Sequence, residues 1–276
     1  MIISLKINLF QNFSCSMLDF NKFNKLTHAV LLYGNHIAGK TNIYNCLKYV
    51  RNIIVKQNTP FLFVDADVEL NFRMQGKICQ YRIVTDCNGI VSEYISFNNI
   101  TNKSEKKHQN SVITTQTHSD IYEWFSQIDF IDSSYEYSID YIGEIDKNID
   151  LINSICGKYV NYIYWLETDY PKIYFFKQSN NIYMNTPQGK IPIKEVQKST
   201  VELISLLPKI ENISYGKKHS VLIIDDITYI AKQRFAQVIL ENFIRRIPYR
   251  SKQQLLATSN DDSFFDSRFM KKIKLM

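Results

Sequence analysis

The pattern of apolar and polar residues predicts strands, a loop and a helix at the start of the chain. Ile2 to Asn8 alternates as a half-buried strand does, and Phe13 to Leu18 is expected to pair with it. Ala29 to Tyr33 is a continuous apolar run, too short for a helix and typical of a buried strand. From Thr41 to Val55 apolar residues recur at helical spacing. We therefore expect a buried strand joined to an amphipathic helix by a short segment that begins with Gly34.

The middle of the chain predicts an antiparallel layer over residues 58–99. Two glycine-containing pairs, Gln75-Gly76 and Asn88-Gly89, are hairpin signals between segments of strand length. Those segments are Val68 to Phe72, Ile78 to Thr85 and Ile90 to Phe97. Residues 100–170 contain many Ile and Tyr residues, at helical spacing in the later part, and we interpret the range as a helical insertion.

The last third of the chain, residues 171–276, alternates strands with helices. Ser220 to Asp226 has four apolar β-forming residues followed by two carboxylates, which is typical of a buried parallel strand. The other predicted elements are short strands near 173–176, 182–184 and 191–193, helices near 200–210 and 230–243, and strands at 254–257 and 271–276. These patterns predict an α/β fold in one domain, residues 1–276, with a mainly parallel core sheet flanked by helices, an added antiparallel layer and the helical insertion. We expect residues 1–57 and 171–276 to form its first and last lobes.

Composition narrows the class of protein. The 276 residues are 45% hydrophobic, enough for a sizeable core, and contain no run of about eighteen uncharged apolar residues. The first residues lack the sections of a signal peptide, so we expect a cytoplasmic protein with no membrane partner. The five cysteines are scattered and form no CxxC pair, which argues against a disulfide framework or structural zinc.

Charge is distributed unevenly along the chain. Residues 119–169 contain eleven Asp or Glu and two Lys, whereas residues 171–276 contain eighteen Lys or Arg and nine Asp or Glu. This basic C-terminal third could attract nucleic acid or an acidic protein. Solvated helix faces that keep the protein soluble explain the pattern equally well.

The segment between the apolar strand and the helix matches the P-loop pattern, GxxxxGKT. In this pattern backbone N–H groups and the helix N-terminus hold the phosphates of ATP. Lys40 would contact the β and γ phosphates, and Thr41 would bind Mg²⁺. The predicted nucleotide-binding residues are Gly34, Asn35, His36, Ile37, Ala38, Gly39, Lys40, Thr41 and Asn42. The alternative is a strand-to-helix turn that happens to contain glycine.

Hydrolysis of a bound nucleotide requires a further carboxylate near the metal. Asp225, at the end of an apolar strand, is predicted to hold Mg²⁺, and Asp226 to orient or deprotonate the attacking water. The alternative is that the two residues cap the helix that follows.

In these residues the chain resembles ABC-type ATPases of the RecF, SMC and OLD kind, and most closely the bacterial abortive-infection ATPases of the AAA type. The resemblance covers most of the chain, but the P-loop is its one specific motif. The matching segments are Ile3 to Ile7, Tyr33 to Asn35, Val68 to Phe72 with Tyr81-Arg82, Ile90 to Glu93, Thr200 to Pro208, Asp225-Asp226 and Gln254 to Thr258. The resemblance implies an ATPase head that forms a homodimer or head-to-head pair through ATP and regulates an effector protein in anti-phage defence.

Three departures from the family fall on positions used for hydrolysis or dimer closure. The resemblance places Ser199 and Thr200 at the signature that contacts the nucleotide of the partner head, with Ser199 where glycine is expected. It matches Asp226 to the catalytic glutamate and Asn260 to the switch histidine. Asp226 is one methylene shorter and Asn260 cannot carry a proton. We therefore predict slow turnover, with Lys40, Asp226 and Asn260 as the catalytic residues.

Two other functions fit the sequence. The chain could bind ATP without hydrolysing it and hold nucleic acid through the basic C-terminal third. It could also be a nuclease or toxin that uses carboxylates of the acidic insertion, although these are typical of solvated helix faces. The carboxylates concerned are Asp120, Glu123, Glu136 and Asp140.

Overall fold

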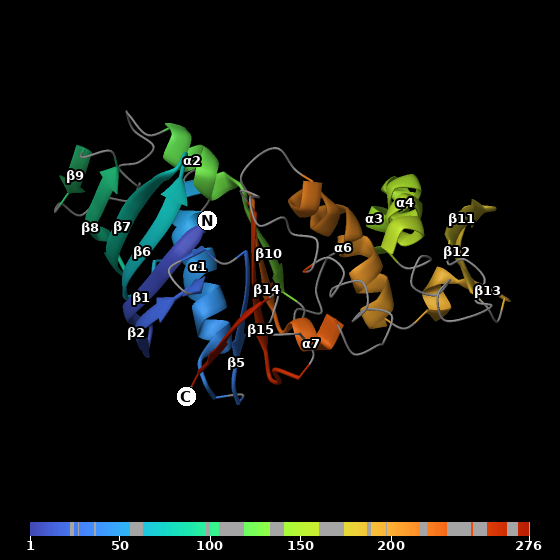
Figure 1. Ribbon diagram of the computed structural model, residues 1–276, viewed down its shortest axis with the longest axis horizontal. Helices are drawn as coiled ribbons and strands as arrows, with labels where there is room; N and C mark the ends of the chain where they lie inside the picture. The colour runs from blue at the N-terminus through green and yellow to red at the C-terminus, as the bar shows by residue number, and fades with distance from the viewer. Residues whose placement is uncertain are drawn as a thin grey trace.

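The computed structural model of the chain places most of its elements (Figure 1). It describes residues 1–22, 25–26, 28–35, 37–55, 63–97, 100–104, 119–132, 141–159, 174–186, 189–196, 198–215, 220–230, 244, 253–263 and 270–275. Among these residues, no helix is both long enough and apolar enough to cross a membrane.

A six-stranded antiparallel sheet forms one side of the molecule. Its strands lie in the order β2-β1-β6-β7-β8-β9. They are β2 (Phe13–Asp19), β1 (Ile2–Phe10), β6 (Ala66–Met74), β7 (Lys77–Asp86), β8 (Gly89–Phe97) and β9 (Ile100–Ser104). The turn between β6 and β7 has positive φ at both Gln75 (49°) and Gly76 (81°), as a tight hairpin turn requires. The predicted hairpin is therefore confirmed.

A five-stranded sheet runs through the centre, and all its neighbouring strands are parallel. Its order is β10-β14-β15-β5-β16. The strands are β10 (Ile128–Asp132), β14 (Ser220–Asp225), β15 (Gln253–Ser259), β5 (Ala29–Tyr33) and β16 (Lys271–Lys274). The strands predicted at 29–33, 220–226, 254–257 and 271–276 are thus confirmed, with small shifts at their ends. Residues joined in this sheet come from widely separated parts of the chain.

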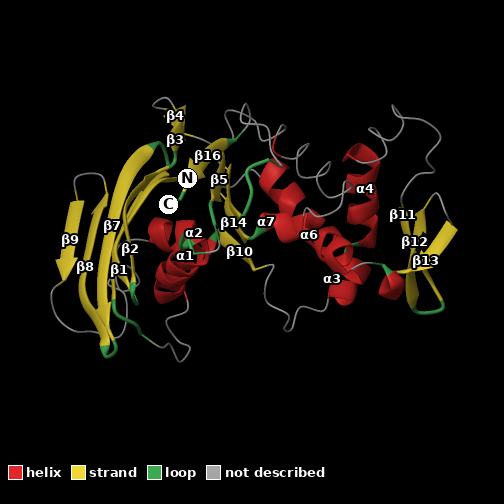
Figure 2. Cartoon of the chain, turned by 90° about the horizontal axis from the view of Figure 1, so that it is seen from below, coloured by secondary structure: helices red, strands yellow, loops and turns green. Residues whose placement is uncertain are grey.

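Helices cover both faces of the parallel sheet (Figure 2). Between the two sheets lie α1 (Lys40–Val55) and α2 (Ser119–Ser126), whose buried residues share one core with Val30, Leu32 and Ile223 of the parallel sheet. The opposite face, which includes Leu31 and Ile224, packs against α6, and α3 and α4 pack on α6 in turn. Those helices are α3 (Tyr141–Lys147), α4 (Ile149–Tyr159) and α6 (Lys198–Tyr215). Alternate residues of each strand therefore enter different cores, as the pleat of a strand dictates.

A side chain joins the two sheets directly. Gln254 of β15 is fully buried, and its amide accepts a hydrogen bond from the N–H of Ile2 (2.7 Å) and donates one to the carbonyl of Ile2 (2.9 Å). One glutamine thus satisfies both backbone groups of a residue of β1, which would otherwise be buried without partners. The sequence pattern predicted only that Gln254 lies in a strand.

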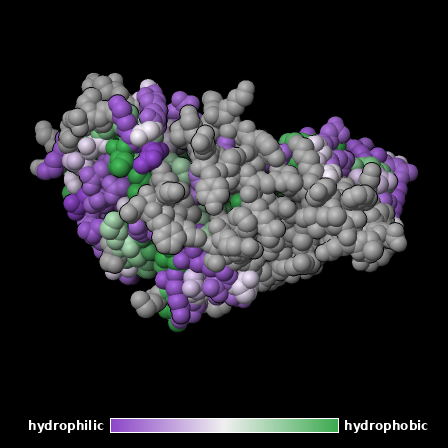
Figure 3. All heavy atoms as spheres, viewed as in Figure 1, coloured by the Kyte–Doolittle hydropathy of each residue, from purple (hydrophilic) through white to green (hydrophobic). Residues whose placement is uncertain are grey.

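A small antiparallel sheet lies at the other end of the molecule (Figure 1). It consists of β11 (Tyr174–Gln178), β12 (Asn181–Thr186) and β13 (Gly189–Pro192), and a 3-10 helix, η2 (Ile193–Glu195), follows. Phe175 faces the core, whereas Phe176 and Tyr183 stack on the outer side beneath the ammonium group of Lys190. The described residues at this end are mostly hydrophilic in Figure 3.

The strands of one sheet do not all come from one of the ranges expected from the sequence. Strands β1 and β2 belong to the antiparallel sheet, although β5 and α1, from the same 57 residues, belong with the parallel sheet. The range 100–170 is only partly helical, because it supplies β9 to one sheet and β10 to the other. The remaining elements are the two-residue strands β3 (Asn21–Lys22) and β4 (Lys25–Leu26) and the helical turn α7 (Ile227–Ile230).

Candidate functional site

The ends of three parallel strands bring the predicted site residues to one edge of the central sheet. Ser259 at the end of β15 is in register with Tyr33 at the end of β5, and Ile224 of β14 is in register with Ala257. The segments that begin at Gly34, Asp226 and Asn260 therefore leave the sheet at the same edge. In open α/β sheets this carboxyl edge is where ligands bind.

The loop from Gly34 to Gly39 is shaped by close backbone contacts. A side-chain Cβ on Gly34 would lie 2.7 Å from the carbonyl oxygen of Leu275, and one on Gly39 would lie 2.1 Å from Cε2 of Phe13. Gly39 also has a φ of 77°, a conformation that residues with side chains adopt at a cost. Both positions therefore need glycine. The contact between Phe13 of β2 and Gly39 was not anticipated from the sequence.

The side chain of Lys40 curls back into this loop. Its Nζ donates to the carbonyl oxygen of Gly34 (2.8 Å) and to that of Asn35. Burial lowers the pKa of Lys40, and the negative charges of Asp226 and Asp225 partly oppose that decrease. The ammonium group is thus held by carbonyl oxygens of the loop itself, within electrostatic reach of both aspartates.

A hydrogen-bond chain fixes the end of β14. Asp225 is buried, and its Oδ1 accepts a hydrogen bond from Oγ1 of Thr258 (2.6 Å) on the neighbouring strand β15. The backbone N–H of Asp226 donates to the same Thr258 oxygen (2.7 Å). The two aspartates were predicted from the sequence, whereas no role was predicted for Thr258.

Asp226 also contacts the helical turn that follows it. Its φ is 48°, in the left-handed region, and its carboxylate accepts a hydrogen bond from the hydroxyl of Thr228, within the turn α7 that follows. Aspartate tolerates this backbone conformation better than most residues. An N-cap residue has extended backbone and accepts a hydrogen bond from a backbone N–H, so this contact is not N-capping. The electrostatic interaction with Lys40 places Asp226 near the loop as well.

The other loop residues differ in exposure. Asn35, Ile37 and Thr41 are exposed, Ala38 and Asn42 are half-buried, and His36 lies outside the described residues. Ile37 is 92% exposed, the highest value among the large apolar residues that are exposed in the described part of the chain. Asn260 is exposed at the end of β15, at the same edge. The structure thus brings together the loop, both aspartates and Asn260.

Ser199 and Thr200 are placed elsewhere. They lie in the first turn of α6, which packs on the face of the parallel sheet opposite to α1. Thr200 is buried within the chain. The structure therefore does not bring these residues to the loop of the same chain, and their predicted contact with a partner's nucleotide stays a prediction.

The carboxylates considered for a nuclease do not form a cluster in the described part of the chain. Asp120 accepts a hydrogen bond from Gln75, and Glu123 accepts one from Gln127 on the surface of α2. Glu136 and Asp140 lie outside the described residues. Among described residues there is no group of three His, Cys, Asp or Glu side chains that could hold a metal ion. The structure therefore offers no support for an active site at these positions.

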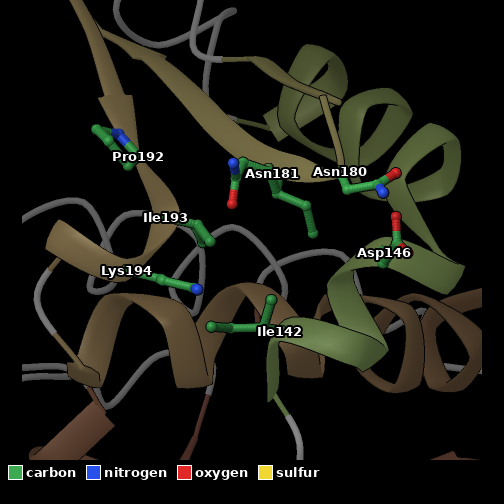
Figure 4. A pocket seen from close by; sticks show the side chains of 8 residues that line it. Ile142, Asp146, Asn180, Asn181, Pro192, Ile193 and Lys194 are labelled. Atoms are coloured by element: carbon green, nitrogen blue, oxygen red, sulfur yellow. The ribbon is translucent and has the colours of Figure 1, made fainter. Parts of the chain in front are cut away.

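A small pocket of about 220 Å³ lies far along the molecule, between α3 and the small sheet (Figure 4). It is lined by Ile142, Asp146, Asn180, Asn181, Ile182, Pro192, Ile193 and Lys194. Asp146 is already paired with Lys177 at 2.8 Å. None of the predicted site residues lines this pocket.

The residues at the carboxyl edge fit a nucleotide with Mg²⁺. An ammonium group held at a glycine-containing loop suits phosphate, and a hydroxyl and carboxylates supply the oxygen ligands that Mg²⁺ prefers. Thr41 is exposed at the start of α1, and one oxygen of Asp225 already has the Thr258 hydroxyl as a partner. Glycine at positions 34 and 39 lets Leu275 and Phe13 pack directly against the loop backbone, which fixes the course of the loop.

Comparisons with known proteins do not establish a family. No protein-family model matches the chain, and no curated protein matches it in sequence. Among solved structures it is similar to the SMC head domain from Thermotoga maritima, with a TM-score of 0.46 and 13% sequence identity. That match covers 94% of this chain and 89% of the other. A likeness this weak carries no functional argument, so the interpretation rests on the residues of the chain itself.

Proposed function

We propose that the chain is a P-loop ATPase that binds ATP with Mg²⁺ at the carboxyl edge of its parallel sheet. One observation carries the proposal: the ammonium group of Lys40 lies inside a glycine-framed loop, within electrostatic reach of the two aspartates that end β14. A strand-to-helix turn that merely contained glycine would have no need for a lysine held in this position.

Each residue has a distinct part in this proposal. The backbone N–H groups of the loop and the N-terminus of α1 bind the phosphates, and Lys40 exchanges its carbonyl contacts for phosphate oxygens. Thr41 and Asp225 hold Mg²⁺, which neutralises charge that develops on the phosphates. Asp226 orients the attacking water or accepts its proton, and Asn260 provides a hydrogen bond from β15. We expect slow turnover, because the Asp226 side chain is short and already accepts a hydrogen bond from the hydroxyl of Thr228.

The biological role that we propose rests on the sequence resemblance alone. ATP joins two copies of the chain, or this chain and a similar head, and the joined pair regulates a separate effector protein in anti-phage defence. Because Thr200 is buried, the exposed Lys198 or a movement of the start of α6 would have to make the contact across the pair.

Titration calorimetry with ATP and Mg²⁺, together with steady-state phosphate release, tests the ATPase proposal. We expect Lys40→Ala to weaken ATP binding at least tenfold and to abolish turnover, because phosphate loses its charged partner. The matched control is Lys77→Ala, which removes an exposed lysine from the hairpin of β6 and β7 and should leave both unchanged. If wild type takes up no adenine nucleotide, the proposal is wrong.

A second variant separates binding from hydrolysis. Asp226→Asn keeps an oxygen that can accept the hydrogen bond from Thr228, but it cannot accept the proton of water as a carboxylate does. We therefore expect this variant to bind ATP and to hydrolyse it at least tenfold more slowly than wild type. Tight ATP binding by wild type without turnover would favour the alternative function, a module that uses ATP as a structural ligand. Light scattering after size-exclusion chromatography, with and without ATP and Mg²⁺, tests whether two copies join.

A further inference from the structure

Thr258 lies between the two strands that carry the proposed site. It is on β15, which pairs with β5 on one side and with β14 on the other, and it is 3% exposed. Its hydroxyl contacts both the carboxylate of Asp225 and the backbone of Asp226. A valine would fill nearly the same space without either hydrogen bond.

The direction of each hydrogen bond follows from the groups involved. The backbone N–H of Asp226 can only donate, so Oγ1 of Thr258 accepts from it over 2.7 Å. The hydroxyl proton of Thr258 is therefore free for Oδ1 of Asp225, which as a carboxylate can only accept, over 2.6 Å. The three groups form one chain with a fixed direction, from the amide of Asp226 to the carboxylate of Asp225.

This chain constrains two features on which the site depends. It anchors one oxygen of the buried Asp225 carboxylate, and so sets the orientation of the other. It also holds the peptide of Asp226 while that residue has a φ of 48°, a conformation in which an aspartate needs support from its surroundings. A single hydroxyl from a neighbouring strand thus fixes both residues relative to β15 and the phosphate loop of β5.

We propose that Thr258 is a positioning residue that orients Asp225 toward Mg²⁺ and holds the backbone of Asp226 beside it. This assignment rests on the proposed function, because Mg²⁺ binding by Asp225 is part of that function. Groups that hydrogen-bond to a metal ligand without touching the metal typically change metal affinity or activity by about 10- to 100-fold when they are removed. The effect should appear in Mg²⁺-dependent steps and not in metal-free nucleotide binding, which depends on the loop.

Two substitutions separate positioning from simple packing. Thr258→Val removes both hydrogen bonds at nearly constant volume. Thr258→Ser retains the hydroxyl and should therefore behave as wild type does. The matched control is Thr85→Val on β7. Thr85 is also buried, and its hydroxyl contacts Tyr49 (2.8 Å) and the carbonyl of Val64 (2.6 Å), away from the site. Thermal unfolding of all variants shows how much each change costs the fold.

The first measurement is the Mg²⁺ concentration that gives half-maximal ATP binding. We expect an increase of about tenfold for Thr258→Val, and less than about twofold for Thr258→Ser and Thr85→Val. ATP binding in EDTA should be the same in all four proteins. If Thr258→Val has the Mg²⁺ dependence of wild type, or if Thr85→Val shifts it equally, the inference is wrong.

The second measurement needs no nucleotide. Amide hydrogen exchange at Asp226, followed by NMR, should be at least tenfold faster in Thr258→Val than in wild type, and unchanged in Thr258→Ser. Equal exchange in wild type and Thr258→Val would overturn the assignment whatever the ATP result. If wild type does not bind ATP but the exchange result holds, the proposed function fails while the Thr258 hydrogen-bond chain stands.

Discussion

The two faces of the parallel sheet are packed in different ways. On the α1 side, large rings fill the core: Phe72 stacks on Trp124 with ring centroids 4.2 Å apart, and the edge of Phe125 contacts both. On the other side, α6 contains Pro208 within its length and brings polar side chains into a mainly aliphatic core. These are Thr200, Glu202, Ser205 and Glu211. The proposed site adjoins the face whose core is filled by large apolar side chains, which suits a loop that must hold its shape.

The largest expected effect compares the two cores directly. Phe72→Ala should lower the free energy of unfolding by about 4 kcal/mol, and Leu207→Ala on α6 by about 3 kcal/mol, because each leaves a cavity among fully buried neighbours. Urea unfolding followed by fluorescence and circular dichroism measures both. If the two faces form one cooperative unit, each variant keeps a single transition. Two separate transitions in either variant would show that the faces unfold independently.

The next largest loss of stability is expected from a substitution in the loop between β5 and α1. Gly39→Ala places a methyl group against Phe13 and forces alanine to a positive φ, so we expect a loss of about 2 kcal/mol in stability. ATP binding should weaken at least tenfold, because the loop has to shift. Calorimetry and thermal unfolding test the two effects. Adding Phe13→Ala removes the clash but not the strain at φ, so it should restore only part of the stability. ATP affinity that stays at the wild-type value in Gly39→Ala would contradict the described loop geometry.

A smaller change, an increase in stability, is expected when the buried Glu202 of α6 is replaced. Burial raises the pKa of Glu202, and Lys198, at 3.9 Å, only partly opposes this. The folded protein therefore binds this proton more tightly than the unfolded chain does. The stability gained from this tighter proton binding is fully present below the ordinary pKa of glutamate, about 4.3. It is lost as the pH rises through the raised pKa of Glu202 in the folded protein.

Glu202→Gln should consequently stabilise the protein at pH 7, by about 1 kcal/mol, because a neutral amide replaces a buried charge. The gain should disappear below about pH 4, where the wild-type carboxyl is neutral as well. Denaturant unfolding at pH 4 and pH 7 measures the difference, with the exposed Glu195→Gln as control. A variant less stable than wild type at pH 7 would mean that the pair with Lys198 outweighs the cost of burial.

The smallest expected effect on stability comes from a second glycine-to-alanine substitution, in α4. Gly157 lies in α4 with open space beside its Cα, since no atom lies within 4 Å of the position that an added Cβ would take. Gly157→Ala should stabilise the protein by about 0.5 to 1 kcal/mol through a more favourable helix propensity. Thermal unfolding checks it. Opposite signs for Gly39→Ala and Gly157→Ala would separate a glycine required by its contacts from one that is not.

Much of the fold could be predicted because its signals are local. The run from Ala29 to Tyr33, the helix that follows and the turn at Gln75-Gly76 each depend on residues adjacent in the sequence. Strand β10 was missed, because its five residues lie in an acidic segment with helical spacing nearby and become a strand by pairing with β14, about ninety residues later in the chain. Such long-range pairing leaves no mark on local periodicity.

The candidate site also has a part that the sequence predicted and a part that it did not. The P-loop spacing and the apolar strand that ends in Asp225 were visible in the sequence, and the structure brings them to one edge. The partners that fix their geometry were not visible, since Phe13 meets Gly39 across the layers and Thr258 meets Asp225 only because β15 lies between β14 and β5. Their identification required the strand order.

The pair of hydrogen bonds between Gln254 and Ile2 also has a mechanical consequence. It joins two sheets that are also linked where Lys271 of β16 donates to the carbonyl oxygen of Asp19 of β2, and it attaches β1 to the strand beside the phosphate loop. A displacement of β15 would therefore pull on the six-stranded sheet at a fixed point instead of sliding past it. A shift at the loop that moved β15 would thus be felt first at Ile2 of β1.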